Sequence, residues 1–386
     1  MAILVIGNGF DLAHGLRTKY SHFLDFVKMF REYEDYVKGE KSPRDKNEAE
    51  LFEFVRSIYI GNNNHSVYNE LAEYIGNNTH NILLTHFLKV YEKRCSEEKD
   101  GWIDFECELA DIVSTFNSAR EYMRAQKGNP SLLPHELAVS LRSFFLANSE
   151  QSLTGVSNFE RLSAEQIENF SEEITYEELK KITRILEIYL AEYIETREVD
   201  KRIKQIADLK IDKVISFNYT NTFQRLYDLQ NKAEYCYIHG RLNRYSNLET
   251  CNLVLGIDEF STEEKADSDN TFVWFKKFYQ RIYKETDSTY IDWLNDYNTS
   301  SFKGPLEIYF YGHSLASTDK DVLKSLIDNP ITKIHIFYPD KKEMAKQIKN
   351  LILIIGKASL IHMTRGINRK IEFIQIDSGE TNDNNY

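Results

Sequence analysis

Small and polar residues directly follow several short apolar runs of this chain, at positions where strands are expected to end. The run of residues 2–6 leads into Gly7 and Gly9, and Gly15 lies six positions further on. Glycines in such a turn let backbone N–H groups approach a phosphate closely. The spacing differs from the dinucleotide-binding fingerprint, because Leu12 occupies the place of the third glycine. The turn is therefore either a phosphate-binding loop or a purely structural turn.

Two polar groups near these strand ends could contact a ligand or serve local structure. Asn218 closes the apolar run of residues 212–218 and is followed by Thr220. Asn and Thr also commonly form turns and begin helices, which would explain them without a ligand. Asp11, in the glycine turn, has the same ambiguity, because an Asp there can cap the following helix.

A histidine and a glycine–histidine–serine sequence close two other apolar runs. His239 could act as a general base near pH 7 or form a structural hydrogen bond. Gly312, His313 and Ser314 end the run that begins at residue 305. A glycine and a hydroxyl suit contact with a ribose or a phosphate, whereas a serine there can also cap the next helix.

The acidic residues around position 106 offer a different chemistry. Asp104 and Glu108 share one face of a predicted helix, and Glu106 lies between them in the sequence. Carboxylates grouped in this way can ligate Mg²⁺, as a metal-dependent nuclease would require. A solvated acidic helix face has the same pattern, so both interpretations stay open.

The strands that must position these residues are concentrated after residue 210. Short apolar runs alternate there with segments of helical periodicity, and this alternation predicts a parallel sheet with helices on both faces. The first apolar run has no other strand near it in the sequence, so we expect it to join the same sheet. The strand candidates are residues 2–6, 212–218, 234–240, 252–257, 305–315, 333–340 and 369–377.

The resulting prediction is an α/β fold with a doubly wound parallel sheet, formed by both ends of the chain and interrupted by a large helical insertion. The sheet domain is expected at residues 1–30 and 208–380. The helical insertion is expected at 31–207, and a flexible tail at 381–386.

The composition of the 386 residues argues against several classes of protein. The four cysteines form no C-x-x-C pair, so we expect reduced thiols and no structural zinc. A net charge of −12 argues against extensive binding to a nucleic-acid backbone. No apolar run is long enough to span a bilayer and no signal peptide is evident, so we expect a cytoplasmic protein without a membrane partner.

Five motifs together resemble the AbiH family of bacteriophage abortive-infection proteins. They follow one another over residues 1 to about 340 as GNGFDLAHGLRTKY, WIDFE, FNYTNTF, IHG and YGHSLASTDKD. This resemblance implies a role in antiphage defence.

The same motifs are similar, more distantly, to the NAD-binding core of sirtuins. That resemblance implies an enzyme that hydrolyses NAD, with Asn218 holding the ribose or the attacking water and His239 acting as the base. It also implies NAD contacts in the glycine turn and at two other strand ends. The implied binding residues are Gly7, Asn8, Gly9, Phe10, Asp11, Gly15, Thr220, Gly312, His313 and Ser314.

The sequence departs from the sirtuin pattern in several places. Thr220 stands where sirtuins have an Asp, and Asp11 replaces a Ser. Residues 17–20 do not follow the P-D-F-R sequence that closes over the sirtuin cofactor. The zinc-binding cysteine pairs of the sirtuin deacylases are absent from the sequence, so protein deacylation is not expected.

We therefore expect an antiphage protein that hydrolyses NAD⁺ to nicotinamide and ADP-ribose without a metal ion. Such an enzyme must be inactive in uninfected cells, which predicts control by homo-oligomerisation or by a protein partner. Two alternatives remain. The pocket could sense a nucleotide without turnover, or Asp104 and Glu106 could serve a metal-dependent nuclease.

Overall fold

The computed structural model describes most of the chain. The described residues are 1–60, 66–97, 103–126, 132–146, 163–257, 272–299, 304–367 and 369–377. The tail predicted at 381–386 lies outside them, as does Trp102 of the WIDFE motif.

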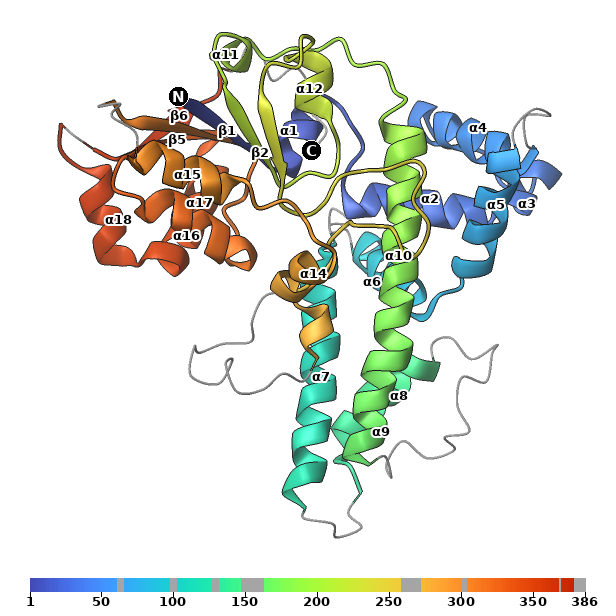
Figure 1. Cartoon of the computed structure of the whole chain (residues 1–386). Helices are drawn as coiled ribbons and strands as arrows, with labels where there is room; N and C mark the ends of the chain where they lie inside the picture. Colours follow the sequence, from blue (N-terminus) through green and yellow to red (C-terminus); the bar gives the residue numbers. More distant parts are fainter. Residues whose placement is uncertain are drawn as a thin grey trace.

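A single sheet of six parallel strands forms the centre of the α/β fold (Figure 1). Its strand order, β3-β2-β1-β4-β5-β6, is that of the doubly wound dinucleotide-binding sheet. The first strand does join the strands from beyond residue 210, and its Val5 lies between Ile215 and Phe310. The strands are β1 (Ala2–Ile6), β2 (Lys213–Ser216), β3 (Glu234–Tyr237), β4 (Leu306–Tyr311), β5 (Thr332–Tyr338) and β6 (Ile371–Gln375).

Alternate side chains of β1 enter two different apolar cores, because successive residues of a strand point to opposite faces. Ile3 and Val5 pack in the core that also contains residues of α15 to α18. Leu4 and Ile6 pack in the core that contains Phe10 of α1 and Phe223 of α12. Both faces of the sheet are therefore covered, which explains the continuous apolar run of this strand.

One predicted strand is wrong. Residues 252–256 have no regular structure, and Ile257 makes only an isolated bridge to Lys276. The segment is apolar because it is a buried loop. A side chain, and not a neighbouring strand, forms hydrogen bonds with the backbone of this loop. Gln280 Nε2 donates to the Leu255 carbonyl oxygen at 2.9 Å, and Gln280 Oε1 accepts from the Leu255 N–H at 3.1 Å.

Helices account for the long section between β1 and β2, as its periodicity predicts. The helices around β1 and of this section are α1 (Asn8–Ala13), α2 (Tyr20–Arg31), α3 (Tyr33–Lys38), α4 (Lys46–Ile60), α5 (Ser66–Asn78), α6 (Ile82–Ser96), α7 (Phe105–Ala125), α8 (His135–Leu146), α9 (Ala164–Asn169), η2 (Phe170–Tyr176), α10 (Glu177–Ile188), η3 (Tyr189–Ile194) and α11 (Lys204–Ala207). Those after β2 are α12 (Thr222–Leu226), η4 (Val273–Phe275), α14 (Lys277–Tyr283), α15 (Tyr290–Thr299), η5 (Ser317–Asp319), α16 (Lys320–Asp328), α17 (Lys341–Ile355) and α18 (Lys357–Thr364). The division of the chain into domains stays a prediction.

Two long helical segments extend away from the sheet (Figure 1). One is α7, and the other is the continuous segment from α9 to η3, in which η2 and η3 are π-helical. Arg120 of α7 pairs with Glu168 of α9 at 3.6 Å, at the ends that are remote from the sheet. Their other ends lie nearer the sheet, where Tyr189 of η3 donates to the carbonyl oxygen of Arg17, between α1 and α2, at 2.7 Å.

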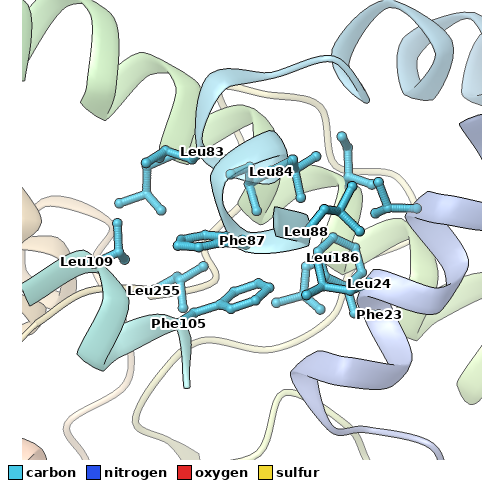
Figure 2. Close-up of a cluster of buried hydrophobic side chains, with 14 of the residues drawn as sticks. Phe23, Leu24, Leu83, Leu84, Phe87, Leu88, Phe105, Leu109, Leu186 and Leu255 are labelled. Carbon is cyan, nitrogen blue, oxygen red and sulfur yellow. The ribbon is translucent and has the colours of Figure 1, made fainter. Parts of the chain in front are cut away.

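A core of aromatic and leucine side chains fixes the sheet-side end of α7 (Figure 2). The Phe105 ring is stacked on Tyr20 and on Phe87, with ring centroids 4.3 Å apart in both pairs. Phe105 is fully buried. Because Phe105 cannot turn without opening this core, the direction of the next side chain, Glu106, is also fixed.

The turns after β1 and β4 are pressed together at the point where the strand order reverses. The Gly9 N–H donates to the Gly312 carbonyl oxygen at 2.8 Å. A Cβ at Gly7 would lie 2.8 Å from His313 Cα, and a Cβ at Gly312 would lie 2.1 Å from the Phe10 nitrogen. These glycines are therefore required by the close approach of two backbones.

Replacing Gly312 by Ala tests this contact. Gly312 has φ +66°, so the substitution adds a collision to the strain of a left-handed conformation. We expect Gly312→Ala to lower the free energy of unfolding by about 3 kcal/mol or more, measured by urea denaturation. Gly366→Ala is the control, because Gly366 has φ +87° but nothing within 4 Å of its Cβ position; it should cost only about 1 kcal/mol. Equal costs for the two variants would contradict the contact.

Candidate functional site

Asn218 joins the ends of β2 and β1. Its Nδ2 donates to the Gly7 carbonyl oxygen at 3.0 Å, and its backbone N–H donates to Ser216 Oγ at 3.2 Å. Its Oδ1 accepts no hydrogen bond from the residues that the structure describes. The amide is thus held at one end, and its oxygen is available to a water or a hydroxyl group.

Asp11 is a buried carboxylate beside this amide. Thr220 Oγ1 donates to Asp11 Oδ2 at 2.6 Å, so Asp11 does not cap α1. Its other oxygen, Oδ1, is buried and has no hydrogen-bond partner among the described residues. Burial raises the pKa of Asp11 to about 6, against the hydrogen bonds from Thr220, Thr222 and Asn218.

The other residues of the glycine turn differ in their surroundings. Phe10 is fully buried and lies 5.7 Å from Tyr311, ring centroid to ring centroid, so it is part of the sheet core. Asn8 is exposed, and its Oδ1 accepts from Thr18 Oγ1 at 2.5 Å. Gly15 has φ +78°, the left-handed conformation that glycine adopts readily.

His239 and His313 face opposite oxygens of one carboxylate, Asp319 of η5. His239 Nε2 lies 3.0 Å from Asp319 Oδ1, and His313 Nε2 lies 3.7 Å from Asp319 Oδ2. The backbone N–H of Leu315 donates to His313 Nδ1 at 2.9 Å, which leaves the ring proton of His313 on Nε2. The Phe217 ring packs against both imidazoles, with centroids 5.4 Å and 4.2 Å away. Ser314, between these groups in the sequence, is exposed.

Lys277 of α14 connects this carboxylate to the helical insertion. Its Nζ lies 3.2 Å from Asp319 Oδ1 and 2.9 Å from Glu106 Oε2 of α7. Lys277, Asp319 and both histidines are buried. The ends of β3 and β4, α14 and the insertion therefore share one buried group of charges.

Burial and the lysine set the protonation of this group. Burial alone would raise the pKa of Asp319, but Lys277, His239 and His313 outweigh it and hold that pKa far below its usual value. Burial raises the pKa of Glu106 to about 7, despite the charge of Lys277. Burial also lowers the pKa of His239, and that of His313 to about 4, so both imidazoles are neutral at pH 7.

The acidic residues of the insertion are engaged with protein groups. Asp104 caps α7, since its Oδ1 accepts from the Glu106 and Cys107 N–H groups at 2.9 and 3.3 Å. Glu106 binds Lys277, and Glu108 lies 2.5 Å from Arg94. Among the residues that the structure describes, no group of three His, Cys, Asp or Glu side chains could hold a metal ion.

Sequence reasoning identified His239, His313 and Glu106 but not the groups that join them. Asp319 lies in the motif YGHSLASTDKD, whose predicted binding residues are Gly312, His313 and Ser314. Lys277 belongs to none of the quoted motifs. The available signal was a pair of lysines between aromatic residues, VWFKKFY, because a lysine that such a segment buries needs a partner of opposite charge.

A cleft of about 330 Å³ lies elsewhere, between α2, α3 and α4. It is lined by residues of both charges, and several of these are paired with each other. Arg17 lies 3.2 Å from Asp25, and Arg44 lies 3.0 Å from Glu48. Because its charges are already satisfied, we assign the candidate site to the strand ends and not to this cleft.

Removing the lysine tests the buried group of charges. In Lys277→Met, Asp319 and Glu106 lose their shared cation, and we expect the free energy of unfolding to fall by about 3–5 kcal/mol. Adding Glu106→Gln should recover part of this loss, because it removes one of the two uncompensated carboxylates. Lys346→Met, which breaks an exposed pair with Glu343, is the control and should cost under about 1 kcal/mol. A similar loss in both lysine variants would argue against the cluster.

The buried carboxylate at position 11 should make stability depend on pH. Its pKa is higher in the folded protein, about 6 against 3.8, so its protonated form is favoured by folding and its ionised form is not. We expect Asp11→Asn to gain stability relative to the wild type as pH rises from 4 to 8, by up to about 3 kcal/mol. Urea unfolding at each pH measures this difference. A constant difference, or one that falls with pH, would contradict it.

Comparisons with known proteins identify a family, but they give no curated relative and no solved structure that is similar to this chain. The family model described as bacteriophage abortive infection AbiH matches residues 3–339, which include the carboxyl ends of β1 to β4. None of the described helices is long and apolar enough to span a membrane. Since the match covers most of the 386 residues, the chain belongs to the AbiH family of bacteriophage abortive-infection proteins.

Proposed function

We propose that this protein acts in abortive infection by hydrolysing NAD⁺ to nicotinamide and ADP-ribose. The site would be the carboxyl edge of the sheet, where the strand order reverses between β1 and β4. In doubly wound sheets, ligands bind outside the carboxyl ends of the strands at such a reversal of strand order. The family's role in defence supports an activity that harms the infected cell.

The observation that carries the proposal is the placement of Asn218, Asp11 and His239 after the neighbouring strands β2, β1 and β3, each with one acceptor atom that no described residue fills. Asn218 Oδ1 and Asp11 Oδ1 accept no hydrogen bond from described residues. His239 Nδ1 likewise has no partner within the described ranges, whereas Nε2 faces Asp319. Open acceptors suit a bound water and the hydroxyl groups of a ribose.

The proposed reaction breaks the bond between the nicotinamide nitrogen and C1′ of the ribose. Nicotinamide leaves as a neutral molecule with the bonding electrons, and an oxocarbenium-like ribose develops. A water held by Asn218 Oδ1 adds to C1′, and its proton passes to the neutral imidazole of His239. Positioning the water and stabilising the ribose cation lower the barrier, and no oxidant or metal ion is needed.

In a diphosphate-binding loop, the backbone N–H groups of the glycine turn face the ligand. Here only one side of the turn could do so. Gly7 and Gly9 are covered on one side by the turn after β4, which fixes the turn rigidly. We propose that the nucleotide contacts its other side, near Asn8 and Asp11. Phe10 would support this turn from the core and not contact the nucleotide.

An assay of purified protein with NAD⁺ tests the proposal. We expect nicotinamide and ADP-ribose to form in equal amounts, measured by mass spectrometry. His239→Gln and Asn218→Ala should each reduce the rate by about 10²–10⁴-fold, because each removes a group that acts in the transition state. His362→Gln, at an exposed histidine of α18, should keep the wild-type rate.

The same variants separate this proposal from the alternatives. Tight NAD binding with no product at any protein concentration would contradict hydrolysis and favour a nucleotide sensor. Magnesium-dependent degradation of DNA or RNA would favour a nuclease, although Asp104 and Glu106 are bound to protein groups. Phage protection that survives both His239→Gln and Asn218→Ala would also contradict the proposed mechanism.

We further propose that the helical insertion controls the site through a second copy of this chain or through a protein partner. The support is structural proximity. Glu106 contacts Lys277, and Tyr189 donates to the Arg17 carbonyl oxygen. Glu195 Oε1 accepts from the N–H of Asn221, in the segment after β2, at 3.2 Å. A shift of either long helix would therefore displace residues that lie close to the candidate site.

A further inference from the structure

We infer that Asp319 is a positioning residue, which holds His239 in the tautomer that carries its proton on Nε2 and leaves Nδ1 as the basic nitrogen. The catalytic meaning of this inference rests on the proposed function, because it assigns Nδ1 as the nitrogen through which His239 would act. The state of the imidazole itself is a property of the protein alone.

The first support is the geometry of the carboxylate. Asp319 Oδ1 lies 3.0 Å from His239 Nε2, a hydrogen-bonding distance, and an ionised carboxylate can only accept. Nε2 must therefore carry the proton whenever His239 is neutral. The second ring nitrogen, Nδ1, then has a free lone pair, and no described residue donates to it.

The second support is the set of groups that keep Asp319 ionised and in place. Lys277 Nζ contacts the same oxygen, Oδ1, at 3.2 Å, and His313 Nε2 faces Oδ2 at 3.7 Å. Two donors therefore hold Oδ1 of Asp319, and the His313 ring lies next to Oδ2. A carboxylate held in this way can orient an imidazole without taking its proton.

The third support is the anchoring of these donors. Lys277 is itself held by Glu106 at 2.9 Å, and Glu106 follows the buried ring of Phe105. The His313 ring is held by the Leu315 N–H and by contact with Phe217. The position of Asp319 is therefore determined by three separate parts of the chain, none of which touches Nδ1 of His239.

Several charged groups face His239 and must be considered in a titration. Asp319 favours the protonated imidazole, whereas Lys277 and, more weakly, Arg281 disfavour it; the neutral His313 ring lies on the same carboxylate. Burial has the largest effect and lowers the pKa of His239. Removal of the Asp319 charge should lower that pKa further, because Lys277 remains.

The test is nitrogen NMR of the full-length protein labelled with ¹⁵N-histidine, with His239→Gln used to assign the His239 signals. We expect the wild type to show a protonated, pyrrole-type Nε2 and an unprotonated, pyridine-type Nδ1. In Asp319→Asn the proton should move in part or wholly to Nδ1, and the pKa of His239 should fall. Asp319→Glu, which keeps the carboxylate, should retain the wild-type tautomer. Asp292→Asn, which removes an exposed carboxylate of α15, is the control and should leave both nitrogens unchanged.

Activity provides a second readout where NAD is hydrolysed. We expect Asp319→Asn to lower kcat by about 100-fold or more with KM changed less than about threefold, because the residue acts through His239 and not on the substrate. Asp319→Glu should recover part of this loss. Near-ultraviolet circular dichroism checks that each variant is folded.

The outcomes separate this inference from the proposed function. If the wild-type protein does not hydrolyse NAD, the proposed function is overturned. The NMR measurement of the His239 tautomer would still decide whether Asp319 is a positioning residue. A proton on Nδ1 in the wild type would overturn the inference even if Asp319→Asn failed to fold. So would an unchanged tautomer in a folded Asp319→Asn variant.

Discussion

The ammonium group of Lys277 is the interaction on which the arrangement of this site depends. It lies buried between Glu106 of α7 and Asp319 of η5, at 2.9 and 3.2 Å. Two carboxylates could not stay buried so close together without a cation between them. Because Asp319 also binds His239, the same contact fixes the histidine at the end of β3. Through this one group, the start of α7 and the end of β3 are joined.

The second constraint is the close approach of the turns after β1 and β4. Gly7, Gly9 and Gly312 leave no room for side chains, and this brings the two central strands together where the strand order reverses. The sequence pattern suggested a choice between phosphate binding and structure for these glycines. The contacts show that Gly7 and Gly9 pack against the turn after β4. Asn8 and Asp11 are then the residues of this turn that could contact a ligand.

Much of the fold could be predicted from the sequence because its strands are short apolar runs separated by helical periodicity. The joining of β1 to distant strands followed from its isolation in the sequence, and the structure confirms it. The error at 252–257 arose because a buried loop and a buried strand have the same apolar pattern, and only the side chain of Gln280 distinguishes them. Lys277 and Asp319 could not be predicted as partners, since 42 residues separate them and ion pairs across a fold leave no pattern in one sequence.

The central claim is that NAD binds at the carboxyl edge of the sheet. Hydrogen–deuterium exchange with and without NAD tests it most directly, because it locates binding without requiring turnover. The claim predicts slower exchange of backbone amides in residues 7–15, 216–222 and 312–319 when NAD is present. Protection confined to the cleft between α2 and α4, or no protection at all at saturating NAD, would contradict it.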